Sequence, residues 1–89
     1  MARPVRAKPR DLTDSWPDSP SSNSAAEVAR HFALNLQTAI GDRSLRATAS
    51  ECGLVHATLI SILNGRTWPD LETMAKLEIG LGARLWPRD

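Results

Sequence analysis

The side chains that most often perform covalent or acid–base chemistry are few in this 89-residue chain. The histidines are His31 and His56, and Cys52 is the single cysteine. No nucleophile, base and acid form a pattern typical of a catalytic set, and no glycine-rich loop could cradle a phosphate. One thiol can form neither an internal disulfide nor a metal site. The sequence therefore predicts a protein that is not an enzyme and that holds no metal or cofactor.

The distribution of charge indicates a different chemistry, the binding of phosphate groups. The formal net charge is only +1, but residues 1–10 hold four bases and no acid, and residues 11–20 hold three acids and no base. A basic segment can reach for nucleic-acid phosphates. The alternative is a solvated tail in which the two stretches compensate each other. The four bases are Arg3, Arg6, Lys8 and Arg10.

The strongest local pattern lies in residues 45–64, LRATASECGLVHATLISILN. Ala49, Gly53, Leu59 and Ile62 follow one another at spacings of four, six and three. Two helices that cross closely through a tight turn need a small side chain at the crossing and a residue that tolerates positive φ in the turn. They also need two apolar side chains that fix the second helix to the core. The spacing therefore predicts a helix-turn-helix unit.

From Phe32 to Pro87, about two-thirds of the chain, the sequence resembles the lambda repressor and Cro type of helix-turn-helix domain. The matching residues are Ser44, Ala49 and Gly53, then HATL (His56 to Leu59), ILNGR (Ile62 to Arg66) and Pro69. The run RTWPDLETMAKLEIGLG, followed by LWP, is similar to small actinobacterial and actinophage members. The resemblance implies a transcriptional regulator, a repressor of phage or prophage type, that binds double-stranded operator DNA.

Some positions depart from that family pattern. Val55 stands where a Ser or Thr usually caps the second helix of the unit, and Leu45 stands where a Gln often touches phosphate. Ile60 and Ser61 replace a small polar residue and a longer polar or basic one. The expected fold is unaffected, but some of the expected DNA anchors are missing.

The resemblance also indicates which residues would contact DNA. With Leu59 facing the core and 100° between residues, one side of helix 56–64 points outward, and its first turn is the part that usually meets base edges. The expected base contacts are His56, Ala57, Thr58 and Ser61. The expected phosphate contacts are Ser44, Arg46, Asn64 and Arg66. For His56, Arg46 and Arg66 the alternative is an ordinary solvated side chain. The basic residues Arg3, Arg6, Lys8 and Arg10 are expected to reach a neighbouring groove.

Helical periodicity in the rest of the chain provides the elements that would position this unit. Apolar residues recur every four positions between residues 28 and 40, which predicts a helix from near Ser24 to Gly41. Further helices are expected over about residues 44–52 and 56–64 and from Pro69, followed by a short last turn before Leu85. No segment alternates with the period of two typical of strands. The expected fold is an all-α, compact bundle of about five short helices.

Composition divides the chain into two parts. Residues 1–24 contain four prolines and many Ser and Asp without a helical period, which is typical of a flexible, extended arm. Residues 25–89 are expected to form the helix-turn-helix DNA-binding domain. Trp16 is the exception within the arm, because a large ring is costly to leave in water. It would pack against the domain or against a protein partner.

The remaining expectations concern partners and location. A homodimer on DNA is expected, with Leu81, Leu85 and Trp86 as the contact and burial within the monomer as the alternative. Two other functions stay open: an antitoxin that binds a toxin and its own operator, and a helical interaction module that does not bind DNA. No apolar run approaches the ~20 residues of a membrane span, and no secretory signal follows the basic N-terminus. We therefore expect a cytoplasmic, nucleoid-associated protein.

Overall fold

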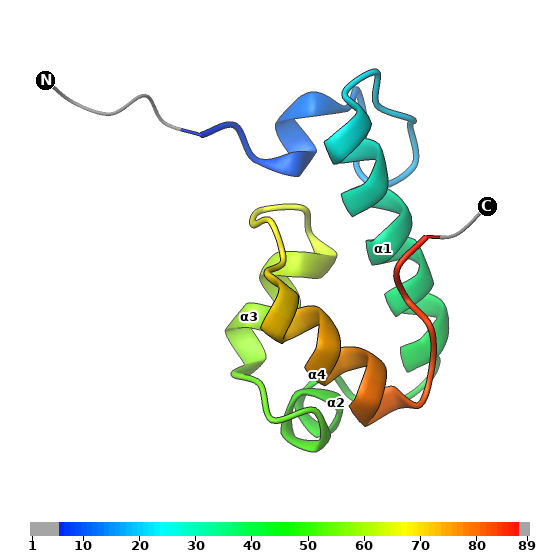
Figure 1. Cartoon of the computed structure of the whole chain (residues 1–89), viewed down its shortest axis with the longest axis vertical. Coiled ribbons are helices and arrows are strands. Elements are labelled where there is room, and N and C mark those ends of the chain that lie inside the picture. Colours follow the sequence, from blue (N-terminus) through cyan, green and yellow to red (C-terminus); the bar gives the residue numbers. More distant parts are fainter. Residues whose placement is uncertain (1–5, 88–89) are drawn as a thin grey trace, which may run out of the picture.

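Four α-helices and one short 3₁₀ helix occur in residues 6–87, the part of the chain that the computed structural model describes. The 3₁₀ helix η1 spans Pro9–Leu12, and the α-helices are α1 (Ser24–Ile40), α2 (Leu45–Glu51), α3 (His56–Leu63) and α4 (Leu71–Leu81) (Figure 1). No strand occurs within this range, so the predicted all-α class is confirmed. The expected last helical turn is not formed; after Gly82 the described chain returns alongside α1 in irregular conformation.

Side-chain caps explain where three of the four α-helices begin. Asn23, Ser44 and Asp70 each accept a hydrogen bond from the backbone N–H three residues later, at 2.9, 3.0 and 2.7 Å. Such a cap contributes about 1 kcal/mol, because it satisfies a donor that the helix itself leaves without a partner. Helix α3 begins after Val55, whose side chain provides no cap. Helix α4 begins two residues beyond Pro69, because Asp70 supplies its cap.

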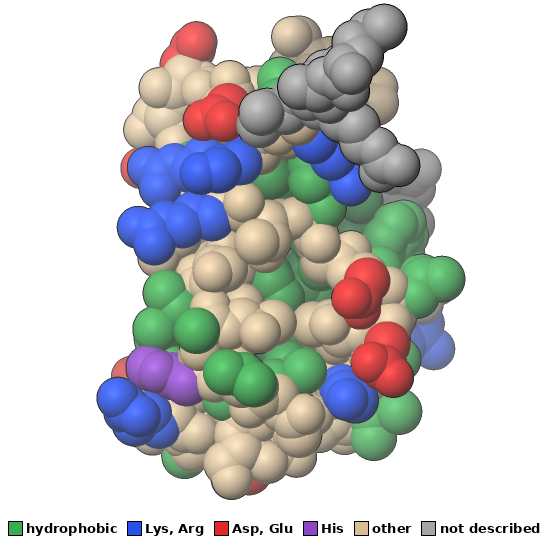
Figure 2. Space-filling view, turned by 90° about the vertical axis from the view of Figure 1, so that its left-hand side faces the viewer, with side chains coloured by type: hydrophobic (Ala, Val, Ile, Leu, Met, Phe, Trp, Pro, Cys, Tyr) green, Lys and Arg blue, Asp and Glu red, His purple; other side chains and the backbone are tan. Residues whose placement is uncertain are grey.

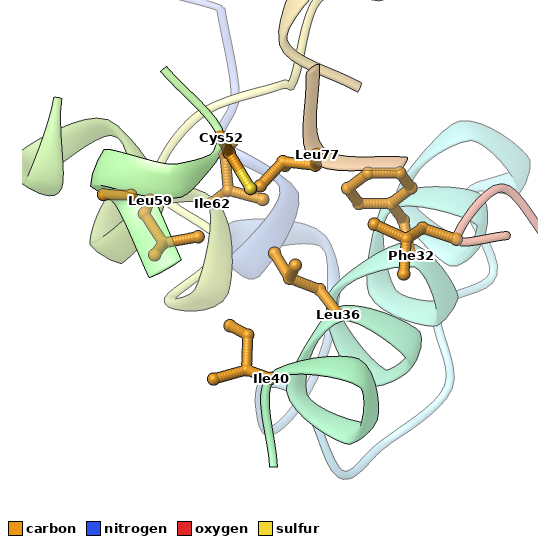
Figure 3. Close-up of a cluster of buried hydrophobic side chains, with 9 residues drawn as sticks. Phe32, Leu36, Ile40, Cys52, Leu59, Ile62 and Leu77 are labelled. Carbon is orange, nitrogen blue, oxygen red and sulfur yellow. The ribbon is translucent and has the colours of Figure 1, made fainter. Parts of the chain in front are cut away.

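The core forms among α1, α2, α3 and α4. Its side chains point toward one another and are at most 5% exposed (Figure 3): Phe32, Leu36, Ile40, Cys52, Leu59, Ile62 and Leu77. Full burial of an aliphatic or aromatic side chain of this size contributes about 1.5–3 kcal/mol. Burial also raises the pKa of the Cys52 thiol, so that cysteine is a small neutral core residue.

A glycine inside α4 sets how closely that helix approaches the end of α2. Helix α4 continues through Gly80, although glycine is unfavourable inside a helix. A Cβ at Gly80 would lie 2.6 Å from the sulfur of Cys52 and 3.0 Å from its Cα. Real Cβ atoms essentially never come as close to another atom as 2.6 Å, so a side chain at this position would force the buried Cys52 or the helix to shift.

The segment before α1, residues 6–23, is folded against the domain, which differs from the flexible, extended arm that its prolines indicate. Pro9 is buried, and the backbone N–H of Arg10 donates to the Gly65 carbonyl at 2.9 Å. The indole N–H of Trp16 donates to the Leu63 carbonyl at 2.9 Å. The Trp16 ring lies where a side chain at Gly65 would be, 2.5 Å from the position of its Cβ. Trp16 therefore packs against the domain, which is one of its two expected positions.

An ion pair on α1 also holds the segment of residues 6–23 against the domain. The Arg30 guanidinium donates to both carboxylate oxygens of Glu27, at 2.8 and 2.7 Å, and to the Pro17 carbonyl at 3.1 Å. Glu27 also accepts from the backbone N–H of Ser21 at 2.9 Å. These hydrogen bonds, first of all that from Arg30, lower the pKa of Glu27 from 4.5 to about 2. The carboxylate is thus charged wherever the protein is folded above that pH.

Candidate nucleic-acid interface

Helices α2 and α3 pack against each other. A short turn joins them. Ala49 is 2% exposed at their contact, and Leu59 and Ile62 hold α3 to the core, as the spacing of these residues predicts. Gly53 has a φ of +70° in the turn, although a Cβ there would meet nothing within 4 Å. The requirement for glycine is therefore one of backbone conformation and not of space. The N–H of Leu54 closes the turn on the Ala49 carbonyl at 2.8 Å.

The outer side of α3 carries the four side chains expected to contact bases. Ala57 and Thr58 are exposed, and His56 and Ser61 are half-buried. Eight residues make this helix about 12 Å long. Its outward atoms are methyl groups, hydroxyls and one imidazole, which can contact base edges but include no long forked donor.

A shallow hollow of about 290 Å³ borders this side of α3. Ala57, Thr58 and Ser61 form one wall, and the chain from Thr67 to Asp70 with Thr73 of α4 forms the other. The cap from the Thr73 N–H lowers the pKa of Asp70, so the far wall carries a negative charge. Phosphates would be repelled there. The favourable approach for a polyanion is therefore along α3 itself.

Arg10, expected as one of the N-terminal bases that reach a groove, and Arg66, expected as a phosphate contact, both lie at the C-terminal end of α3. Arg66 follows Gly65 directly, and the Gly65 carbonyl accepts the backbone N–H of Arg10. Both arginines are exposed, and we call them the basic pair. Figure 2, which looks at the side of the molecule where α3 lies, shows Lys and Arg side chains gathered at the upper left. Asn64 is exposed beside this pair at the end of the helix.

Two more bases of the N-terminal segment lie near the same end of the domain. The guanidinium of Arg6 stacks over the Trp68 ring, with its central carbon 4.8 Å from the ring centroid. The indole N–H of Trp68 in turn donates to the Ala7 carbonyl at 2.9 Å. Lys8 is exposed next to these residues. Arg3, the remaining base expected to contact DNA, lies outside the described residues.

The N-terminal end of α2 holds the other expected phosphate contacts. Arg46 and Ser44 are both exposed there. The Ser44 oxygen accepts the Ala47 N–H, which leaves its hydroxyl hydrogen able to donate. Sequence reasoning missed Arg43, an exposed base in the preceding loop that pairs with Glu51 at 3.7 Å. Its position next to the cap of α2 could have identified it as a further phosphate contact.

The expected dimer contact at Leu81, Leu85 and Trp86 is only partly at the surface. Leu85 is 1% exposed and belongs to the core, so its prediction as a subunit contact is wrong and the monomer-burial alternative holds. Its carbonyl accepts from Asn35 at 2.9 Å, and its N–H donates to Glu78 at 2.7 Å, which draws the last described residues onto the domain. Leu81 is half-buried against that core, and Trp86 remains 45% exposed.

Comparisons with known proteins add no identification. The chain matches no protein-family model, and neither a curated protein nor a solved structure matches it. Within residues 6–87, none of the helices has the length and apolar character needed to cross a membrane.

Proposed function

We propose that this protein is a sequence-specific transcriptional regulator, a repressor, that binds double-stranded DNA in the cytoplasm. In this proposal α2, the Gly53 turn and α3 form a helix-turn-helix unit, and α3 enters the major groove. The observation that carries the proposal is the arrangement of charge around α3: small polar and apolar side chains along the helix, with exposed arginines at both ends of the unit. Arg46 lies at one end and the basic pair at the other.

This arrangement suits the geometry of duplex DNA. A helix in the major groove is flanked on each side by a phosphate backbone, so cations are useful at the ends of the unit and reading groups along its middle. Thr58 and Ala57 can contact a thymine methyl, and Ser61 and His56 can exchange hydrogen bonds with base edges. None of them forms the forked contact of an arginine with guanine. Affinity is therefore expected to come mainly from phosphates, and sequence preference from a few contacts of about 1–3 kcal/mol each.

The first experiment is selection of bound sequences from a random pool of duplex DNA, followed by binding measurements on the best sequence at several salt concentrations. Arg66→Ala and Arg10→Ala should each flatten the plot of log affinity against log salt by about 0.9 units, the effect of one phosphate contact. Arg84→Ala is the matched control, because Arg84 is exposed on the C-terminal segment beside α1 and not beside α3.

Base contacts are tested on the same selected sequence. Thr58→Ala and Ser61→Ala should change which base pair is preferred at one position, while the salt dependence stays as in the unchanged protein. The proposal fails if no sequence is enriched from the pool. It also fails if Arg84→Ala lowers the salt dependence as much as Arg66→Ala does.

A further inference from the structure

The C-terminal end of α3 is completed by a side chain from the N-terminal segment. The last four carbonyls of an α-helix have no partner within the helix. In α3, three of them accept from the backbone N–H groups of the residues that follow, at 2.9 to 3.1 Å: those of Ile60, Ser61 and Ile62. The fourth, that of Leu63, accepts from the Trp16 indole at 2.9 Å. Trp16 therefore caps α3 from outside the helix.

The same tryptophan fixes the chain around Arg10. Its ring lies on Gly65, 2.5 Å from the position that a Cβ there would take, and the Gly65 carbonyl accepts the backbone N–H of Arg10 at 2.9 Å. Pro9, directly before Arg10, is buried and begins the short helix η1. Residues 9–16 are thus attached to the end of α3 at two points, through Leu63 and Gly65. The backbone of Arg10 has a fixed place there.

The basic pair is open to an external anion. Neither Arg10 nor Arg66 is in an ion pair with another part of residues 6–87, and both are exposed. The partial negative charge at the C-terminal end of α3 favours cations at this place. The two guanidinium groups repel each other, and an anion that contacts both relieves this repulsion. The pair therefore suits a phosphate backbone.

We propose that Trp16 is a positioning residue for DNA binding: its ring on Gly65 holds Arg10 beside Arg66, so that both arginines contact the same phosphate backbone. This inference rests on the proposed function. Arg66 does not need Trp16, since its own N–H donates to the Ser61 carbonyl of α3 at 2.9 Å. Arg10 does need it, since it is attached through Gly65.

The attachment has a consequence for affinity and for the place of the contact. A charged side chain on a flexible arm must lose conformational freedom when it binds, whereas a docked one has already lost much of it on folding. Arg10 therefore contributes more to DNA binding when the segment is docked. Its phosphate lies next to that of Arg66, and not in a neighbouring groove.

A double-mutant cycle tests the positioning role. Arg10→Ala, Trp16→Ala and their combination are compared with the unchanged protein on the selected duplex, at several salt concentrations. Arg10→Ala should flatten the plot of log affinity against log salt by about 0.9 units and lower affinity about eightfold at about 0.1 M salt. Trp16→Ala should do the same, although it removes no charge, and the combined variant should lose no more than either. A full salt dependence in Trp16→Ala, or additive losses in the combined variant, overturns the proposal.

Two further variants separate positioning from stability. Leu85→Ala is the control, because it removes a core side chain on the C-terminal segment and should leave the salt dependence as in the unchanged protein. Trp16→Phe keeps a ring on Gly65 and should also retain it. Circular dichroism at the temperature of the binding assay shows that each variant is folded. A flatter plot for Leu85→Ala means that the slope follows stability, and a loss in Trp16→Phe equal to that in Trp16→Ala means that the ring does not position Arg10; either result overturns the proposal.

The position of the contacted phosphates gives a test that does not depend on the folding of a Trp16 variant. Phosphates of the selected duplex are replaced one at a time by neutral methylphosphonates. Replacement of the phosphate that Arg10 contacts should weaken binding of the unchanged protein but not of Arg10→Ala, and Arg66→Ala identifies its own phosphate in the same way. The two should be one phosphate or neighbours on one strand. Phosphates on opposite strands, or separated by a groove, overturn the proposal.

Failure of this inference is distinct from failure of the proposed function. Enrichment of a sequence from the random pool and the flatter salt plot of Arg66→Ala test the proposed function, and neither depends on Trp16. A protein that passes both tests and keeps its full salt dependence in Trp16→Ala binds DNA without the positioning role.

Discussion

The most direct test of the folded N-terminal segment is Trp16→Ala. The ring of Trp16 covers Gly65, and its indole N–H donates to the last residue of α3. Loss of a fully buried aromatic ring costs about 3–5 kcal/mol, and since Trp16 is only half-buried we expect about 2 kcal/mol. Loss of its hydrogen bond adds about 1 kcal/mol. The total of about 3 kcal/mol should lower the melting temperature by about 12–24 °C in a domain of this size.

Urea unfolding followed by far-UV circular dichroism measures this difference without depending on tryptophan fluorescence. Trp16→Phe is the matched variant, because it keeps an aromatic ring on Gly65 and removes the indole donor. It should lose only about 1–1.5 kcal/mol. If Trp16→Ala unfolds within about 0.5 kcal/mol of the unchanged protein, the range of an ordinary surface substitution, residues 6–23 do not contribute to the fold as described.

Three further changes probe other parts of the structure. Leu85→Ala should cost about 2–5 kcal/mol by the same unfolding assay, whereas a surface position would lose almost nothing. Gly80→Ala should destabilise the protein by about 1–3 kcal/mol through its contact with Cys52, although alanine ordinarily strengthens a helix by about 1 kcal/mol; a gain in stability would contradict the close crossing of α2 and α4. Glu27, with its pKa lowered to about 2 from 4.5, should stabilise the fold fully above about pH 4.5 and lose that contribution as the pH falls toward 2. An acid titration of stability should therefore show the gap between Glu27→Gln and the unchanged protein closing in this window, and a gap independent of pH would contradict the role of the carboxylate.

Local patterns predicted the helices well, because their causes lie within a few residues. The four-residue apolar period before Ile40 and the capping side chain of Ser44 act over one or two turns. The buried Ala49 and the positive φ of Gly53 also follow from local spacing. The role of Gly80 was missed, since its reason is Cys52, which is distant in the sequence and lies on the other side of a helix contact.

The N-terminal segment shows where composition misleads. Prolines, serines and aspartates indicate an extended arm, yet Pro9 is buried and Trp16 contacts α3. Trp16 bonds to Leu63 and the Arg10 backbone bonds to Gly65, about fifty positions away in each case, and no local rule connects them. The same long-range packing brings Arg10 beside Arg66. The sequence around either arginine alone does not indicate that the candidate interface contains this basic pair.

The attachment of the N-terminal segment also constrains how the chain can fold. The hydrogen bonds from Trp16 to Leu63 and from Trp68 to Ala7 join residues 47 and 61 positions apart. Contacts across such separations require closure of a long loop before they can form, so helical proteins that depend on them fold more slowly than bundles with only local contacts. During synthesis the segment leaves the ribosome before α3 does, but its docking site does not exist until α3 is complete. Arg10 therefore cannot take its final position beside Arg66 before α3 has formed.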